Sequence, residues 1–232
     1  MPFFVLVDYD NLATRDKSQT LVYVTDKILN ILSPAEVTQK NVTVRLYGGW
    51  YENNNMTRKA QNLSAEIGGA FPKTTTLSDN KATAVVSVEL ALSLQIAPAD
   101  FLYNTFRRHG YPAGLMAHDP VARGCHHPVC PISEVYKFLQ QNYCHVCRTV
   151  RPEDIIYRQE QKLVDTMLTS DMIFLGNSEK AFCLVSSDDD FWPGIYTSLI
   201  GGATVYHIHT KLRATPRHYT KSNRANYLQK QL

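Results

Sequence analysis

Short apolar runs alternate with amphipathic segments along most of this chain, and the alternation predicts strands joined by helices. The runs 3–7 and 181–185 are continuously apolar and end at polar residues, which is typical of central strands buried on both faces. Alternating apolar and polar positions predict further strands over 42–47, 84–96 and 203–208. Apolar residues at helical spacing predict helices over 17–32, 56–67, 157–175 and 191–200. The predicted fold class is therefore α/β, with a mainly parallel central sheet flanked by helices.

One stretch, 98–150, breaks this rhythm. It contains five of the 11 prolines and a cluster of cysteines. We therefore expect it to be an inserted module in an α/β domain that is formed by 1–97 and 151–210. A basic C-terminal segment, 211–232, follows. A chain of 232 residues is long enough for one such domain with an insertion.

Composition and charge narrow the class of partner. With 44% hydrophobic and 19% charged residues, the chain is not expected to be disordered throughout. Six of the 24 Lys and Arg residues, and none of the 21 acids, lie after residue 190. An acidic body with a basic tail suits a polyanionic partner better than a membrane, although a simply solvated tail is the open alternative.

The chain also lacks the sequence signals of membrane insertion. No stretch approaches the ~18 uninterrupted apolar residues of a membrane helix. The opening apolar run is too short for the core of a signal peptide. We therefore expect no membrane association and a reducing, cytoplasmic location, while the oligomeric state stays open.

Acidic residues follow two of the predicted buried strands. Asp8 and Asp10 come after the first strand, and Asp188, Asp189 and Asp190 follow the strand over 181–185. The carboxyl ends of parallel strands meet at one edge of a sheet, where ligands bind. Asp and Asn are also common caps of turns and helices, so a purely structural role is the alternative.

A third group, Asp165, is predicted to lie on the helix that leads into the later strand. Carboxylates that cluster resist ionisation unless a cation joins them, and Mg²⁺ or Mn²⁺ prefers oxygen ligands. Such an ion activates water and neutralises charge on a phosphate. The predicted chemistry is therefore phosphodiester or phosphomonoester hydrolysis. The side chains of Asn11 and Ser186 are expected to hold Asp8 and Asp188, respectively.

Four motifs in order resemble those of NYN domains, which belong to the PIN-like nuclease superfamily. They are Val7–Leu12, Lys162–Asp165, Leu184–Phe191 and Gly201–Val205. The resemblance implies a PIN-like sheet and a divalent-metal-dependent ribonuclease, most simply an endoribonuclease. By position, it implies metal binding by Asp8, Asp165, Asp188 and Asp190, with Asn11 as an orienting residue. Tyr9, where the family often has Gly, and the additional Asp189 depart from the pattern without removing a ligand.

Cations near these motifs are candidates for contact with RNA. Lys162 precedes Asp165 by one helical turn, and could contact a phosphate or form a structural ion pair with the acids. Arg107 and Arg108 belong to the basic surroundings of the inserted module and are our other candidate substrate-binding residues. The expected partner is RNA of undetermined type, and the inserted module could instead bind a protein.

Four of the five cysteines form two pairs, Cys125 with Cys130 and Cys144 with Cys147. Two pairs at such spacing predict a structural Zn²⁺ site with four thiolates. A helix over 132–142 is expected between them. His126, His127 or His145 could replace one thiolate, and free thiols or disulfides are the alternatives. Cys183 lies in an apolar run and is predicted to be a buried thiol.

Two other functions compete with the nuclease. In a haloacid-dehalogenase-like phosphatase, Asp8 would be the covalent nucleophile and Asp10 the acid–base residue. Asn11 stands where those enzymes usually have Thr or Val, and the helix with Asp165 would then have no explanation. The other alternative is a catalytically silent module for RNA binding or assembly.

Overall fold

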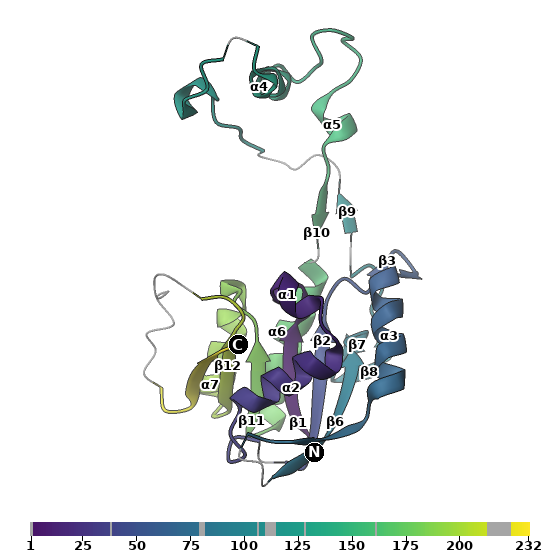
Figure 1. The fold of residues 1–232 in the computed structure, drawn as a ribbon, viewed down its shortest axis with the longest axis vertical. Coiled ribbons are helices and arrows are strands. Elements are labelled where there is room, and N and C mark those ends of the chain that lie inside the picture. The colour runs from purple at the N-terminus through teal and green to yellow at the C-terminus, as the bar shows by residue number, and fades with distance from the viewer. Residues whose placement is uncertain are drawn as a thin grey trace. The chain divides into compact units, whose positions relative to one another are not determined.

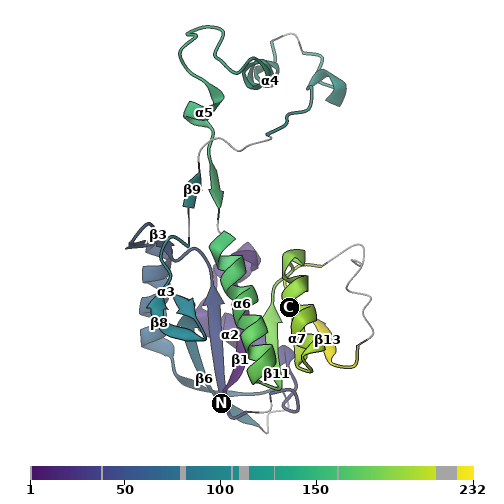
Figure 2. The ribbon, with the colours of Figure 1, turned by 180° about the vertical axis from the view of Figure 1, so that it is seen from behind.

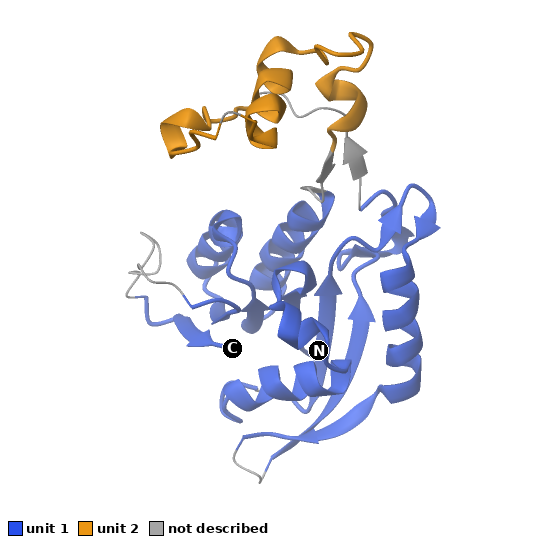
Figure 3. Cartoon of the chain, turned by 45° about the horizontal axis from the view of Figure 1, so that its top comes forward, with its two compact units in different colours: residues 1–106, 161–232 blue, residues 107–160 orange. Residues whose placement is uncertain are grey.

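The computed structural model describes residues 2–37, 39–78, 82–105, 107–109, 115–127, 129–160, 162–212 and 224–232, of which 107–109, 158–160 and 162 are described by their backbone alone. It divides into two compact units (Figure 3). Unit 1 comprises Met1–Phe106 and Gln161–Leu232, and unit 2 comprises Arg107–Glu160. Our sequence analysis placed the insertion at 98–150. Residues 98–101 instead belong to β8 (Ala97–Phe101) of unit 1, and unit 2 continues to residue 160.

A seven-stranded sheet forms the centre of unit 1 (Figure 1). Its strand order is β13-β12-β11-β1-β2-β6-β5, and all neighbours are parallel except β5, which runs antiparallel to β6. The strands are β1 (Phe3–Asp8), β2 (Asn41–Tyr47), β5 (Lys73–Thr76), β6 (Thr83–Leu90), β11 (Ala181–Val185), β12 (Thr204–His209) and β13 (Tyr227–Gln231). The predicted α/β class with a mainly parallel sheet is confirmed.

Helices cover both faces of this sheet, which explains why the central strands are continuously apolar. Phe3, Val5 and Val7 of β1 pack in one buried cluster with α2 (Leu21–Ile31) and α3 (Arg58–Ala70). Phe4 and Leu6 pack in the other cluster with α6 (Lys162–Ser178) and α7 (Trp192–Ile200), which cover the face seen in Figure 2. Each fully buried apolar side chain contributes about 1.5–3 kcal/mol.

Smaller elements complete unit 1. They are η1 (Tyr9–Asn11), α1 (Thr14–Lys17), β3 (Tyr51–Glu52), β4 (Asn55–Met56), β7 (Ser93–Leu94) and η3 (Asp189–Phe191). Short hairpins are formed by β3 with β4 and by β7 with β8. The helix predicted over 17–32 begins later, at Leu21, because Thr20 accepts a hydrogen bond from the Tyr23 N–H and caps the start of α2.

The strand predicted over 84–96 ends earlier, at Leu90. Arg45 of β2 is buried, and its guanidinium donates to Glu89, to Asp171 (3.2 Å) and to the Ser93 carbonyl oxygen. A buried guanidinium requires such acceptors. The chain therefore turns after β6, which brings the Ser93 carbonyl to Arg45. The helix predicted over 157–175 likewise starts later, at Lys162, because 158–160 form a strand.

The C-terminal segment adds a strand that the sequence pattern did not reveal. β13 pairs with β12 and extends the sheet. Lys230 forms an ion pair with Glu36 (2.5 Å) and donates to the Ile31 carbonyl oxygen, so this cation is structural. Arg213, Arg217 and Lys221 of the basic segment lie outside the described residues.

Unit 2 is built differently. Its elements are β9 (Arg107–His109), η2 (Val121–Arg123), α4 (Pro131–Gln141), α5 (Pro152–Ile155) and β10 (Arg158–Glu160). Strands β9 and β10 pair antiparallel, and α4 confirms the helix expected between the cysteine pairs. Among the described residues of this unit, Pro120 and Pro152 alone are buried. The described part of unit 2 therefore has almost no hydrophobic core.

No helix in the described part of the chain combines the length and the apolar character needed to cross a bilayer.

Candidate active site

Asp8 is the last residue of β1, and it is only 7% exposed. β1 lies beside β11 in register Val7↔Val185, so the residue after β11, Ser186, comes next to Asp8. The Ser186 hydroxyl donates to Asp8 Oδ2 (2.8 Å), and the Asn11 N–H donates to Asp8 Oδ1 (3.3 Å). Both carboxylate oxygens of Asp8 are thus held by donors from two different segments.

Asp188 and Asp190 continue from the same strand end. Ser186 Oγ accepts a hydrogen bond from the Asp188 N–H (3.0 Å), so one hydroxyl links the two acidic segments. Asp188 caps η3, with its Oδ1 accepting from the Asp190 N–H (3.0 Å). Asp188 is half-buried and Asp190 is exposed. Asp188 therefore both caps η3 and belongs to the group of acids around Asp8.

Asp165 lies in the first turn of α6, which packs on β1 and η3. Burial raises the pKa of its carboxyl to about 6, with further contributions from the negative charges of Asp8, Asp188, Asp190 and Asp10. The charges of acids from three separate segments therefore act on one another.

The pKa of Asp8 is raised in the same way. Burial brings it to about 6, and the charges of Asp10 and Asp188 add to the shift, while the hydrogen bonds from Ser186 and Asn11 oppose it. Near pH 7, Asp8 is thus largely ionised at a free-energy cost, which a cation would remove.

The expected side-chain bond from Asn11 to Asp8 is wrong. Asn11 holds Asp8 through its backbone N–H, and its side-chain carbonyl instead accepts from the Thr210 hydroxyl (2.9 Å). Thr210 is buried and follows β12. Sequence analysis missed it, although a hydroxyl residue at the carboxyl end of a third neighbouring strand was an available signal.

Asp10 faces a different set of partners. Its Oδ2 accepts from the Gly49 N–H (3.1 Å), and its Oδ1 is in an ion pair with Lys59 of α3. The Lys17 ammonium donates to the Asp10 carbonyl oxygen (3.0 Å). Sequence analysis missed Lys59 and Lys17, because nothing in the local sequence links either of them to Asp10.

A buried histidine supports the strand end that carries Ser186. His207 Nε2 lies 2.9 Å from the Ser186 carbonyl oxygen, and its Nδ1 lies 2.8 Å from the Tyr227 hydroxyl. A carbonyl can only accept, so Nε2 carries the proton and, in the neutral ring, Nδ1 accepts from Tyr227. This arrangement fixes the backbone at Ser186, and the sequence analysis did not foresee it.

The predicted substrate-binding cations cannot be placed. The side chains of Lys162, Arg107 and Arg108 all lie outside the described residues. The backbone places Lys162 at the start of α6, three residues before Asp165.

The cysteines of unit 2 are free thiols that lie in two pairs. A hydrogen bond with Cys125 is the main cause that lowers the pKa of Cys130, helped by the N–H groups of Ile132 and Ser133. Hydrogen bonds from Thr149 and Val150, and one with Cys144, lower the pKa of Cys147 to about 6. Each pair therefore favours a thiolate. Cys183 is buried as predicted, and burial raises the pKa of its thiol.

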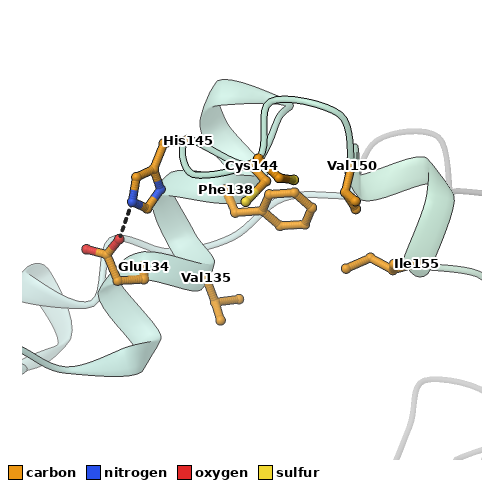
Figure 4. Close-up of a pocket in the computed structure, with 8 residues that line it drawn as sticks. Glu134, Val135, Phe138, Cys144, His145, Val150 and Ile155 are labelled. Carbon is orange, nitrogen blue, oxygen red and sulfur yellow. Dashed lines mark ion pairs between the residues drawn. The ribbon is translucent and has the colours of Figure 1, made fainter.

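A hollow of about 390 Å³ lies beside the second pair (Figure 4). Val135 and Phe138 of α4, together with Val150 and Ile155, give it apolar walls, and Cys144 lies at its edge. Glu134 and His145 form an ion pair there (3.6 Å).

In the described part of the chain, no three His, Cys, Asp or Glu side chains are close enough to hold a metal ion as they stand. The two cysteine pairs are too far apart to bind one ion together. The acids influence one another's pKa values, but they do not surround a single point at ligand distance.

Fold and site together define an α/β protein with an acidic cluster at the carboxyl edge of a parallel sheet. Comparison with known proteins adds no relative, since the chain matches no family model, no curated protein and no solved structure.

Proposed function

We propose that unit 1 is a divalent-metal-dependent ribonuclease of the NYN type, with a PIN-like fold. The proposal is carried by three acids from three segments: the charge of Asp188 helps to raise the pKa of Asp8, and the charges of Asp8 and Asp188 help to raise that of Asp165. The donor set is made of carboxylate oxygens, which suits Mg²⁺ or Mn²⁺ better than softer metals. Asp190 is the fourth acid of this cluster.

Each residue of the cluster has a role in this proposal. Asp8, Asp165 and Asp188 would hold the ion, and Asp190 would bind it directly or through water. A bound ion supplies an activated water and neutralises charge on the phosphate that is attacked. The chain itself orients Asp8, through the Ser186 hydroxyl and the Asn11 N–H. Thr210 and His207 in turn fix Asn11 and the backbone of Ser186.

For unit 2 we propose a structural Zn²⁺ ion bound by Cys125, Cys130, Cys144 and Cys147. The unit spans 54 residues, Arg107–Glu160, and buries almost nothing among its described residues. Domains of this size without a core usually need a metal or disulfides. Backbone N–H groups already stabilise the thiolate forms of Cys130 and Cys147, and thiolates are the ligands that Zn²⁺ prefers. To bind one ion, the two pairs would have to approach each other.

Contacts of Asp10 favour the nuclease over the phosphatase. An acid–base residue must exchange its proton with a substrate. Asp10 is instead engaged by Lys59 and by the Gly49 N–H. Replacing Asp10 by Asn would silence a phosphatase and only weaken a nuclease.

The decisive experiment compares wild type with Asp8→Asn on single-stranded and structured RNA, with Mg²⁺ or Mn²⁺ and with EDTA. We expect cleavage by wild type in the presence of the metal, and a loss of at least 100-fold (about 2.7 kcal/mol in the barrier) in Asp8→Asn. Asp100→Asn, which changes an exposed carboxylate of β8, is the matched control. Undiminished cleavage by a folded Asp8→Asn protein would contradict the proposal. RNA binding without cleavage by wild type would favour the silent module.

A further inference from the structure

Two lysines from different helices contact Asp10, on the side of the acidic cluster that faces β2. Lys59, from α3, forms an ion pair with the Asp10 carboxylate. Its ammonium also lies 4.7 Å from the ring centre of Tyr9 and 5.4 Å from that of Trp50. Lys17, from α1, donates to the Asp10 carbonyl oxygen (3.0 Å). The position of Lys59 is therefore fixed by an ion pair and two aromatic faces.

Helix stability does not account for Lys59. It is the second residue of α3, and the exposed Arg58 is the first. The amino end of a helix carries partial positive charge, so cations in its first turn are unfavourable, and the first turn of α3 has no acid. Asp10 comes from a different part of the chain and supplies the missing negative charge.

The ion pair also leaves the ammonium accessible. The Lys59 side chain is 39% exposed, and the second oxygen of Asp10 is engaged by the Gly49 N–H. Lys59 and Lys17 place two cations against one acid. The β2 side of the site is thus cationic, whereas the β11 side carries Asp188 and Asp190.

We infer that Lys59, assisted by Lys17, binds a backbone phosphate of RNA adjacent to the one that is cleaved. This inference rests on the proposed ribonuclease function and names how its substrate is positioned. An RNA strand carries one charge per nucleotide, so its phosphates extend beyond any metal held by the acids. An ammonium is a compact point charge that suits a phosphate. Because Asp10 and the two rings already restrict Lys59, it loses little side-chain freedom when RNA binds.

The test measures binding of a fluorescein-labelled single-stranded RNA at several salt concentrations with Mg²⁺ present. The Asp8→Asn protein is the parent, so that RNA is bound and not cut. Adding Lys59→Met should raise the Kd about three- to tenfold near 0.1 M salt. It should also reduce the slope of log Kd against log salt by about 0.7, the value for one phosphate contact on a single strand. A purely structural lysine would not change this slope.

Two variants serve as controls. Lys59→Arg keeps the charge and should bind RNA within about twofold of the parent. Lys73→Met removes a lysine of β5 that is paired with Asp26 in a similar way (3.0 Å), and should change neither the Kd nor the slope. If Lys59→Met does not fold, Lys17→Met replaces it in the test, with the same expected direction.

A folded Lys59→Met protein that binds RNA with the affinity and slope of the parent would overturn the inference. The proposed function would still stand if wild type cleaves RNA and Asp8→Asn does not. If wild type never cleaves RNA but Lys59→Met still lowers the slope, the proposed function fails and the phosphate contact survives.

Discussion

Units 1 and 2 differ in how many apolar side chains they bury. In unit 1, the two faces of β1 enter separate apolar clusters, and helices cover the sheet on both sides. In unit 2, α4 has no buried residue, and apolar side chains such as Ile132 and Val146 are exposed. Unit 1 can therefore accommodate an unfavourable cluster of charges, whereas for unit 2 we propose that stability comes from a metal bound by its cysteines.

Of the changes considered, removal of metal from unit 2 should have the largest effect on folding. With Zn²⁺, we expect one ion per chain. A strong chelator should then remove the helical signal of α4 and α5, because structural zinc contributes on the order of 10 kcal/mol of folding free energy. Both tryptophans, Trp50 and Trp192, lie in unit 1, so tryptophan fluorescence should stay unchanged.

Thiol reactivity provides the control for this experiment. Chelation should make four thiols reactive, while Cys183 stays protected until unit 1 unfolds, because it is fully buried. Full reactivity of Cys144 and Cys147 in zinc-saturated protein would show that the pairs do not bind the metal.

Matched valine substitutions test the contrast in packing. Val24 of α2 is 2% exposed and Val135 of α4 is 52% exposed. Val24→Ala should lower the free energy of unfolding of unit 1 by about 2 kcal/mol, measured by urea titration of the tryptophan fluorescence. Val135→Ala should shift the stability of unit 2 by less than about 0.5 kcal/mol, measured by circular dichroism with Zn²⁺. Equal losses would mean that Val135 is buried in the folded protein.

The charge cluster predicts a smaller change in stability than the loss of Val24. Without divalent ions, Asp8→Asn should stabilise unit 1 at pH 7.5 by about 1–2 kcal/mol, because it removes a buried, repelled charge and can still accept the Ser186 hydrogen bond. Urea titration in EDTA measures this difference. Saturating Mn²⁺ should reverse the order and make wild type the more stable protein.

The pH dependence of this difference follows from the same pKa. The pKa of Asp8 is about 6 in the folded protein and 3.8 in the unfolded chain, so the folded state holds the proton more tightly. The stability gained from the protonated carboxyl is fully present below pH 3.8 and is lost as the pH rises through 6. Wild type and Asp8→Asn should therefore have similar stabilities near pH 4. A difference that does not depend on pH would argue against this account.

Periodicity alone predicted the apolar strands 3–7 and 181–185, because a strand that is buried on both faces has only apolar residues. It also predicted that Asp8 and Asp188 lie at one edge of the sheet, since parallel strands with right-handed crossovers align their carboxyl ends. Local pattern could not show that the strand over 84–96 ends at Leu90, because the reason is Arg45 on another strand.

Tertiary structure alone decided which groups support the acids. The Ser186 hydroxyl reaches Asp8 only through the register of β1 with β11, and Lys59 meets Asp10 only because the start of α3 lies beside η1. Hydrogen bonds and ion pairs depend on distances of a few ångströms between residues far apart in the chain, and hydrophobic spacing carries no information about them. The sequence by itself determined which strands are buried and where acids follow them, because burial and periodicity are local properties of the chain.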